Sequence, residues 1–118
     1  MEMHLSSRGD FERVYRAGKR YHGKLLTAFV LPNSLSHHRL GITASRKALG
    51  KAVDRNRAKR LLRETFRVTK TRLDVLHQRY DWVLNARRAL LDPDSWKRIE
   101  DFEKIVVSVA KEEITELV

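Results

Sequence analysis

The chain has 118 residues, with 25 Lys or Arg against 15 Asp or Glu, which gives a formal net charge of +10. The absence of cysteine excludes thiolate zinc sites, iron-sulfur clusters, thiol nucleophiles and disulfide bonds. We expect one domain over residues 1–118, because a chain of this length buries enough surface to fold without a metal or disulfide. The N-terminus lacks a signal-peptide pattern and no stretch approaches the ~20 apolar residues of a membrane span, so we expect a cytoplasmic protein.

The first half of the chain predicts one helix and two strands. Residues 7–17 have apolar side chains at helical spacing and are followed by Gly18, a common residue at helix ends. Residues 25–31 form an apolar run closed by Pro32, which is typical of a strand entering a turn. Residues 39–45 alternate between apolar and small or polar side chains, and we expect this half-buried strand to pair with the preceding one as a hairpin.

The second half of the chain predicts two helices around a third strand. Asp54 is a suitable N-cap for a helix over residues 55–76, a segment without Gly or Pro. Residues 81–86 are typical of a more fully buried strand. Asp92 and Pro93 are suited to open a last helix. The apolar residues of this last helix recur every three or four positions and are Trp96, Ile99, Phe102, Val106 and Val109.

The order of these elements is helix, strand, strand, helix, strand and helix. This order indicates an α+β fold, a two-layer sandwich in which helices pack on a small sheet. No internal repeat, linker or low-complexity segment divides the chain.

Most of the excess positive charge lies in one segment. Residues 46–70 hold ten basic and two acidic residues, so they carry +8 of the net +10, and the rest of the chain is nearly neutral. A field of this kind attracts a polyanion, either nucleic acid or an anionic lipid surface, and charge alone does not choose between them.

The helix over residues 55–76 is amphipathic on a helical wheel. Its apolar arc must face the sheet and consists of Ala58, Leu61, Leu62, Thr65, Phe66, Val68, Leu73 and Leu76. A second arc is cationic and consists of Asn56, Lys59, Arg60, Arg63, Arg67 and Lys70. A face that only keeps a protein soluble normally mixes charges of both signs. A stripe of one sign costs stability through self-repulsion, which a bound phosphate backbone offsets, so we expect a nucleic-acid partner.

Three segments resemble the sequence signatures of the protein subunit of bacterial ribonuclease P. Residues 55–64, RNRAKRLLRE, resemble the family pattern R-N-R-x-K-R-x-x-R-[EQ]. Residues 39–47, RLGITASRK, resemble its R-[LIV]-G-[LIV]-[ST]-[VA]-[SA]-[KR]-K strand. Residues 10–15, DFERVY, followed by Gly18, resemble its F-x-x-[VI]-[FY]-x-x-G opening.

The resemblance implies an element order αβββαβα with a left-handed βαβ crossover around the basic helix. It also implies the non-catalytic protein subunit of a ribonucleoprotein endoribonuclease, in which the RNA hydrolyses a phosphodiester to remove the 5′ leader of precursor tRNA. The implied partners are this catalytic RNA and the 5′ leader, with no membrane and no small-molecule substrate. The holoenzyme RNA would use a divalent metal (Mg), and the protein alone would bind none firmly.

By position, the resemblance and the cationic stripe assign two RNA-binding surfaces. No residue is expected to be catalytic. The surface for the catalytic RNA would consist of Arg46, Lys47, Arg55, Asn56, Arg57, Lys59, Arg60, Arg63 and Arg67. The leader-binding cleft would be lined by Phe11, Tyr15 and Phe29. Aromatic rings beside cations suit single-stranded RNA because every base has a π-face, although rings at helical spacing more often belong to a core.

Two other classes of function stay open at this point. One is a ribosomal-type structural RNA-binding protein, and the other is a DNA-binding regulator that lays the basic helix in a major groove. A regulator would usually show a dimerising face and a shorter second helix, and neither is evident. The adjacent His37 and His38 lie on an expected hairpin loop where neighbouring side chains diverge, so we expect no metal site there, and no Gly-rich phosphate loop is evident.

Overall fold

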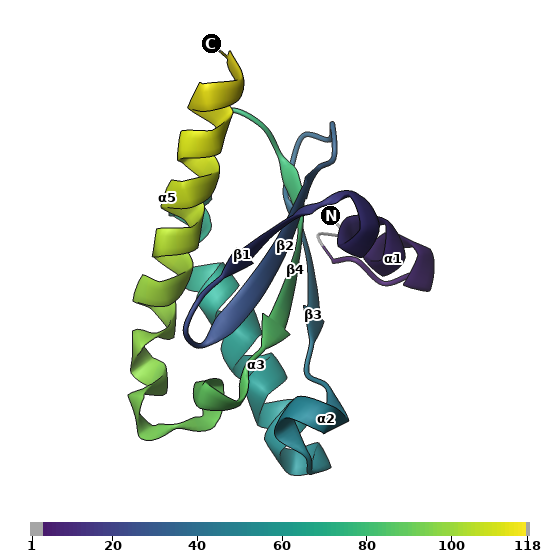
Figure 1. Cartoon of the computed structure of the whole chain (residues 1–118), viewed down its shortest axis with the longest axis vertical. Coiled ribbons are helices and arrows are strands. Elements are labelled where there is room, and N and C mark those ends of the chain that lie inside the picture. Colours follow the sequence, from purple (N-terminus) through teal and green to yellow (C-terminus); the bar gives the residue numbers. More distant parts are fainter. Residues whose placement is uncertain (1–3, 118) are drawn as a thin grey trace.

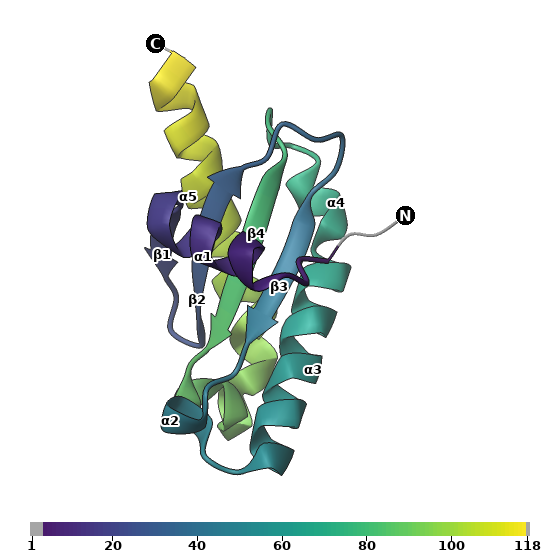
Figure 2. The same ribbon diagram turned by 90° about the vertical axis from the view of Figure 1, so that its right-hand side faces the viewer.

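The computed structural model describes residues 4–117. Four strands form one sheet in the order β1-β2-β4-β3, with α1 on one face and α3 and α5 on the other (Figures 1 and 2). The expected α+β class is confirmed, and α1 adds a partial third layer. The elements are α1 (Arg8–Ala17), β1 (Lys19–His22), β2 (Leu26–Pro32), β3 (Arg39–Thr43), α2 (Arg46–Leu49), α3 (Ala52–Val68), α4 (Lys70–Leu73), β4 (Tyr80–Ala86), the 3-10 turns η1 (Arg88–Leu91) and η2 (Pro93–Lys97), and α5 (Arg98–Leu117).

The pattern of residues alone did not predict β1, although the element order implied by the resemblance includes it. β1 pairs antiparallel with β2, with Lys19 opposite Val30 and His22 opposite Thr27. Of its four residues only Tyr21 is apolar, so the strand contains no hydrophobic run that could reveal it.

The expected hairpin between residues 25–31 and 39–45 is wrong. β2 pairs antiparallel with β4, and β3 pairs parallel with β4. The loop after β2 passes the start of β4 before β3 begins, and there the backbone N–H of Asn33 donates to the carbonyl oxygen of Arg79 at 3.0 Å. β4 is therefore a central strand, and its burial on both faces explains its nearly continuous apolar run.

The connection from β3 to β4 runs through α2, α3 and α4. In Figure 2, β3 and β4 both point downwards, α3 lies behind the sheet, and the chain steps from β3 to the strand on its left. A parallel crossover with this geometry is left-handed, which is the uncommon hand. The crossover that the resemblance implied is thus present.

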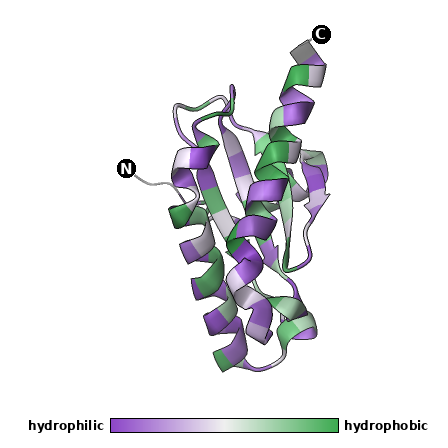
Figure 3. Ribbon diagram, turned by 90° about the vertical axis from the view of Figure 1, so that its left-hand side faces the viewer, coloured by the Kyte–Doolittle hydropathy of each residue, from purple (hydrophilic) through white to green (hydrophobic). Residues whose placement is uncertain are grey.

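The main core lies between the sheet and the helices α3 and α5. Trp82 of β4 is fully buried and packs edge-on against Phe102 of α5, with ring centroids 5.4 Å apart. The apolar arc of α3 contributes Ala58 and Leu62, as expected, and Figure 3 shows the alternation of hydrophobic and hydrophilic residues along α3 and α5. Val68 is an exception, because α3 ends at this residue and leaves its side chain exposed.

A smaller core lies between α1 and the opposite face of the sheet. Leu5, Val14 and Val83 are buried there, and Phe11 packs against them. Gly41 of β3 permits this close packing, since a Cβ atom at that position would lie 2.7 Å from Cζ of Phe11. This contact holds α1 close to the sheet.

The basic helix differs from the prediction at both ends. α3 begins at Ala52 after Lys51, so Asp54 lies in the first turn rather than at the N-cap. A carboxylate in that turn still interacts favourably with the helix dipole. At the other end, the hydroxyl of Thr69 donates to the Thr65 carbonyl at 2.8 Å, and such side-chain bonding bends or interrupts helices. The expected continuous helix to residue 76 is divided at Thr69 into α3 and α4.

The last helix begins at Arg98 and not at Asp92 and Pro93. The turns η1 and η2 join β4 to α5, and the fully buried Leu90 anchors η1 in the main core. Because Leu90 is fixed in the core, the chain passes through η1 and η2 before α5 begins. Trp96 lies in η2 and is 65% exposed, so its expected place on the apolar face of the last helix is wrong.

Candidate nucleic-acid-binding surfaces

The first candidate surface is basic and is formed by α2 and α3. Because α3 packs Ala58 and Leu62 against the sheet, its polar side chains face solvent. Seven of the nine residues that the sequence assigned to the catalytic RNA are exposed, and the other two, Arg55 and Lys59, are half-buried. We call the nine residues the α2–α3 basic surface: Arg46, Lys47, Arg55, Asn56, Arg57, Lys59, Arg60, Arg63 and Arg67.

The charges of this surface are not neutralised by the protein. Within residues 4–117, none of its eight cations forms an ion pair with a carboxylate. Glu64 of α3 pairs instead with Arg98 at the start of α5. Arg55 donates from Nη1 to the carbonyl oxygen of Gly50 at 2.7 Å and keeps its full charge. The positive field is therefore available to phosphate groups.

Two local features position the short helix α2, which the sequence did not predict. The Oγ atom of Ser45 accepts a hydrogen bond from the backbone N–H of Ala48 at 3.1 Å and caps the helix. Gly50 ends it with φ of 79°, a left-handed conformation that favours glycine. The chain turns there into α3, so Arg46 and Lys47 lie at the same end of the molecule as the first turns of α3 (Figure 2).

A groove of about 520 Å³ separates α1 from α3. It is lined by Lys59 and Arg63 of the α2–α3 basic surface, and by Phe11 and Gly41. Phe11 thus lies beside the basic helix, with its ring packed onto β3.

The second candidate surface is the part of the sheet that α1 leaves uncovered. Thr27 of β2 lies opposite His22 of β1 and Asn85 of β4. Thr43 of β3 lies opposite Asn85. Residues directly opposite one another point to the same face of a sheet, so these four form a polar row across all strands. A groove of about 510 Å³, which we call the sheet groove, is lined by Thr27, Thr43 and Asn85 of this row.

Asn85 is a functional candidate that the sequence analysis missed. Its Oδ1 atom accepts hydrogen bonds from the hydroxyl of Tyr15 at 3.0 Å and from Oγ1 of Thr43 at 2.6 Å. The signal that could have found it is a polar residue inside the otherwise buried run of β4. These hydrogen bonds connect α1, β3 and β4 within the sheet groove.

Two of the three aromatic residues predicted for the leader cleft lie together. Tyr15 lines the sheet groove and meets Phe29 edge-on, with ring centroids 4.8 Å apart. The guanidinium of Arg20 lies 5.8 Å from the centroid of the Phe29 ring, which is a cation–π contact. Phe11 does not join them, because it lines the separate groove between α1 and α3.

The two candidate surfaces meet at α2. Ser45 and Ala48 line the sheet groove, and Arg46 and Lys47 between them belong to the α2–α3 basic surface. Arg88, which follows β4, adds a further cation to the sheet groove. A single extended polyanion can therefore contact both surfaces in succession.

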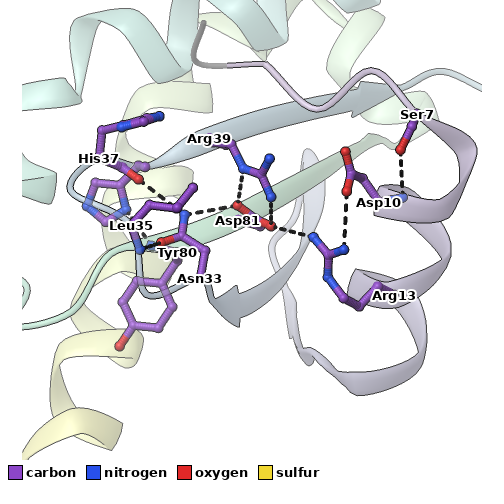
Figure 4. Close-up of polar contacts among 10 residues, drawn as sticks. Ser7, Asp10, Arg13, Asn33, Leu35, His37, Arg39, Tyr80 and Asp81 are labelled. Atoms are coloured by element: carbon purple, nitrogen blue, oxygen red, sulfur yellow. Dashed lines mark hydrogen bonds and ion pairs between the residues drawn. The ribbon is translucent and has the colours of Figure 1, made fainter. Parts of the chain in front are cut away.

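A buried carboxylate ties α1 to β3 and β4 (Figure 4). Asp81 accepts hydrogen bonds from Arg39 at 2.8 and 2.7 Å, from Asn33 at 2.9 Å and from Arg13 at 3.1 Å. Burial alone would raise the pKa of Asp81, but these hydrogen bonds outweigh it and hold the pKa below its ordinary value. The network fixes α1, and with it Tyr15, over the sheet.

The histidine pair offers no metal site. His38 is buried, and its Nδ1 atom accepts hydrogen bonds from the backbone N–H of Tyr80 at 3.0 Å and from Nε1 of Trp82 at 3.1 Å. Among residues 4–117, no three His, Asp or Glu side chains lie together in a way that could hold a metal ion. Within the same range, no helix has the length and apolar character needed to cross a membrane.

Comparison with known proteins gives matches over most of the chain. The family model described as Ribonuclease P matches residues 1–110. A ribonuclease P protein component from Methylococcus capsulatus is 40% identical over 100 residues, which cover 85% of this chain and 75% of the relative. The solved RNase P protein of Staphylococcus aureus superposes with a TM-score of 0.75 at 30% identity and covers 94% of this chain and 97% of its own. A mutant of that protein, described as having defective mRNA degradation activity, superposes with a TM-score of 0.74 at 32% identity, covering 92% and 88%.

Proposed function

The chain belongs to the ribonuclease P protein family, and from this we propose that its α2–α3 basic surface binds the catalytic RNA and its sheet groove binds the 5′ leader of precursor tRNA. Family membership makes the chain a protein cofactor of ribonuclease P, the non-catalytic subunit of a ribonucleoprotein endoribonuclease in tRNA processing. It decides against the ribosomal-type RNA binder and the DNA-binding regulator that the sequence left open.

The unpaired cations of the α2–α3 basic surface support its role in binding the catalytic RNA. All of them lie outside the hydrophobic core, so they can turn towards a partner without disturbing the fold, and arginine predominates among them. Arginine presents a planar fork of donors that suits bidentate contacts with phosphate. Each phosphate that the surface neutralises releases counterions, which strengthens binding at low salt.

The composition of the sheet groove supports its role in binding a single-stranded leader. Tyr15 is 38% exposed, Phe29 lies next to it, and Arg88 supplies a cation. Stacking on rings and contact with cations tolerate many base sequences, as a cofactor for many precursor tRNAs requires. Asn85 and Thr43 add polar groups that can contact a base edge or ribose.

One observation carries the proposal: the two surfaces are continuous through α2. The catalytic RNA must hold the cleavage site, and the 3′ end of the leader lies at that site. An RNA bound along α3 therefore brings the 3′ end of the leader to Ser45 and Ala48, where the sheet groove begins.

The test is a series of precursor tRNAs with leaders of increasing length, bound by the chain reconstituted with its cognate RNA subunit. Replacing Tyr15 with Ala should weaken binding of long-leader precursors by roughly 1–3 kcal/mol and leave mature tRNA binding unchanged. Tyr15→Phe is the matched control, because it keeps the ring and removes only the hydrogen bond to Asn85. Equal losses for leaderless and long-leader substrates would contradict the assignment of the sheet groove to the leader.

We also propose that the holoenzyme uses divalent metal, supplied as Mg, bound mainly by its RNA. The cations of the α2–α3 basic surface would then reduce the metal concentration needed to bring RNA and substrate together, since they offset phosphate repulsion. Residues 1–118 would act as one domain in the cytoplasm, where precursor tRNA is processed. A magnesium titration of the RNA with and without the protein measures the expected shift.

A further inference from the structure

A second group of cations lies at the end of the β1–β2 hairpin, outside both surfaces predicted from the sequence. A pocket of about 680 Å³ is formed there between the hairpin, the residue that follows β4, and α5. Its basic lining residues, which we call the hairpin basic site, are Arg20, His22, Lys24, Arg87 and Lys104.

Most of the positive charge of this site is unpaired. The one acid that lines it, Asp101, accepts hydrogen bonds from the backbone N–H groups of Lys24 at 2.9 Å and Leu25 at 3.0 Å. Lys104 pairs with Glu100 at 3.6 Å. The other cations of the site, Arg20, Lys24 and Arg87, form no ion pair with any carboxylate in the described part of the chain.

The hairpin basic site adjoins the sheet groove at the hairpin end of the sheet, where it extends around to the face covered by α5. Arg87 lines both, and its Nη1 atom donates to the carbonyl oxygen of Gly23 at 2.9 Å, which holds the guanidinium at the hairpin end. His22 begins the polar row that passes through Thr27 to the sheet groove. Arg20 lies over Phe29, beside the rings of the groove.

We propose that the hairpin basic site binds the phosphate backbone of the distal, 5′ part of the leader after the leader has crossed the sheet groove. This inference rests on the proposed function. If the catalytic RNA lies along α3, the cleavage site lies at the β3 edge of the sheet, and the leader must run from β3 towards β1. Its 5′ end then leaves the protein over the hairpin, where the unpaired cations lie.

The lining of the site indicates that phosphate, not a base, is recognised. Tyr21 is the one aromatic ring of the pocket besides the imidazole of His22, and it packs against the main core. Arg20 and Lys24 are exposed and can move to a phosphate. Binding should therefore tolerate any leader sequence and weaken with salt.

The test compares Arg20→Gln/Lys24→Gln with wild type in the reconstituted holoenzyme, using leaders lengthened one nucleotide at a time. The double variant should bind short-leader precursors like wild type and lose roughly tenfold in affinity once the leader reaches the hairpin, with a salt slope smaller by about 0.7 for each phosphate that it no longer neutralises. Arg8→Gln/Lys111→Gln removes the same charge from two exposed positions outside the site and serves as the control. A photo-crosslinker at the leader 5′ end should label residues 19–24 when the leader is long.

The outcomes separate this inference from the proposed function. Equal loss at every leader length, mature tRNA included, would mean that the hairpin contacts the catalytic RNA and would overturn the inference. If the double variant binds precursors of every leader length like wild type and no crosslink to the hairpin forms, the site is only a solvent-exposed charged face, and this result would also overturn the inference. Either result leaves intact the weaker binding of long-leader precursors by Tyr15→Ala, whereas loss of that effect contradicts the proposed function itself.

Discussion

Arg39 on β3 and Asp81 on β4 form a bidentate ion pair, in which Nε of Arg39 lies 2.8 Å from Oδ1 of Asp81 and Nη2 lies 2.7 Å from Oδ2. The parallel register places the two residues directly opposite each other. The Asp81 side chain is 1% exposed, and Arg13 of α1 donates to the same carboxylate. One buried charge therefore joins the strand that leads into the basic helix to the helix that carries Tyr15.

Asp81→Asn should destabilise the protein by about 3 kcal/mol, because it leaves the guanidinium of Arg39 partly buried without its counter-charge. Since the folded state lowers the pKa of Asp81 below its ordinary 3.8, this stabilisation is complete above about that pH and is lost as the pH falls below it. Urea unfolding at neutral and acid pH measures both effects. Asp94→Asn, at an exposed position, should change stability by less than ~0.5 kcal/mol, and an equal loss there would contradict the network's role.

His38 should make stability depend on pH in a different range. Burial lowers the pKa of His38 below its ordinary 6.5, and its Nδ1 atom must stay unprotonated to accept from Tyr80 and Trp82. The unfolded chain binds a proton that the folded chain excludes, so stability is complete above about pH 6.5 and falls as the pH drops below it, by at most ~1.4 kcal/mol per unit. His38→Asn keeps an acceptor but does not titrate, and should remove this slope. An unchanged slope in the variant would assign the effect to another group.

The α2–α3 basic surface predicts a loss of RNA binding without a loss of fold. Arg60→Ala/Arg63→Ala should weaken binding to the cognate catalytic RNA and reduce the salt slope by about one unit for each phosphate that the variant no longer neutralises. Thermal stability should barely change, because both side chains are exposed. The matched control is Arg8→Ala/Arg72→Ala, which removes two arginines already paired with carboxylates. If Arg60→Ala/Arg63→Ala binds the catalytic RNA as tightly as wild type at every salt concentration, the surface serves only to keep the protein soluble.

Much of the fold could be predicted from the sequence, because the spacing of apolar residues and the positions of turn residues mark the long elements. The limits of α1, the buried strand β4 and the sheet-facing arc of α3 follow from such patterns. The pairing of strands did not follow, since β2 and β3 are consecutive in sequence and suggested a hairpin, whereas β4 lies between them in the sheet. A helical wheel does not predict the break at Thr69, because residues 55–76 contain no Gly or Pro.

The α2–α3 basic surface could be predicted from the sequence, because it depends on the positions of charged residues along one helix. The sheet groove could not, because it depends on how the strands pair. The cations of α3 lie within one helical segment, so the face that most of them share follows from their spacing and helical geometry. The polar row that contains Thr27, Thr43 and Asn85 comes from three strands far apart in the chain, and only their pairing brings it together. Phe11 and Tyr15 share a helix, yet their side chains enter different grooves.

Phe11 provides a test of that difference. Gly41→Ala would place a Cβ atom 2.7 Å from the Phe11 ring, so we expect a loss of roughly 1–3 kcal/mol from overpacking. In a Phe11→Leu background the same substitution should cost less, because the clashing ring edge is gone. A double-mutant cycle by urea unfolding measures this coupling. Strictly additive losses would contradict the packing of Phe11 on β3.

The last prediction is that the purified protein, without its RNA partner, does not cleave precursor tRNA. Phosphodiester hydrolysis needs a positioned metal-activated water or a strong base together with stabilisation of the leaving group, and the α2–α3 basic surface and sheet groove supply cations, amides and rings. Added to the catalytic RNA, the protein should mainly lower the apparent KM and the magnesium requirement, since its cations offset phosphate repulsion. Cleavage of precursor tRNA that survives nuclease-contamination controls and is abolished by a single carboxylate substitution would show that this chain has a catalytic centre of its own.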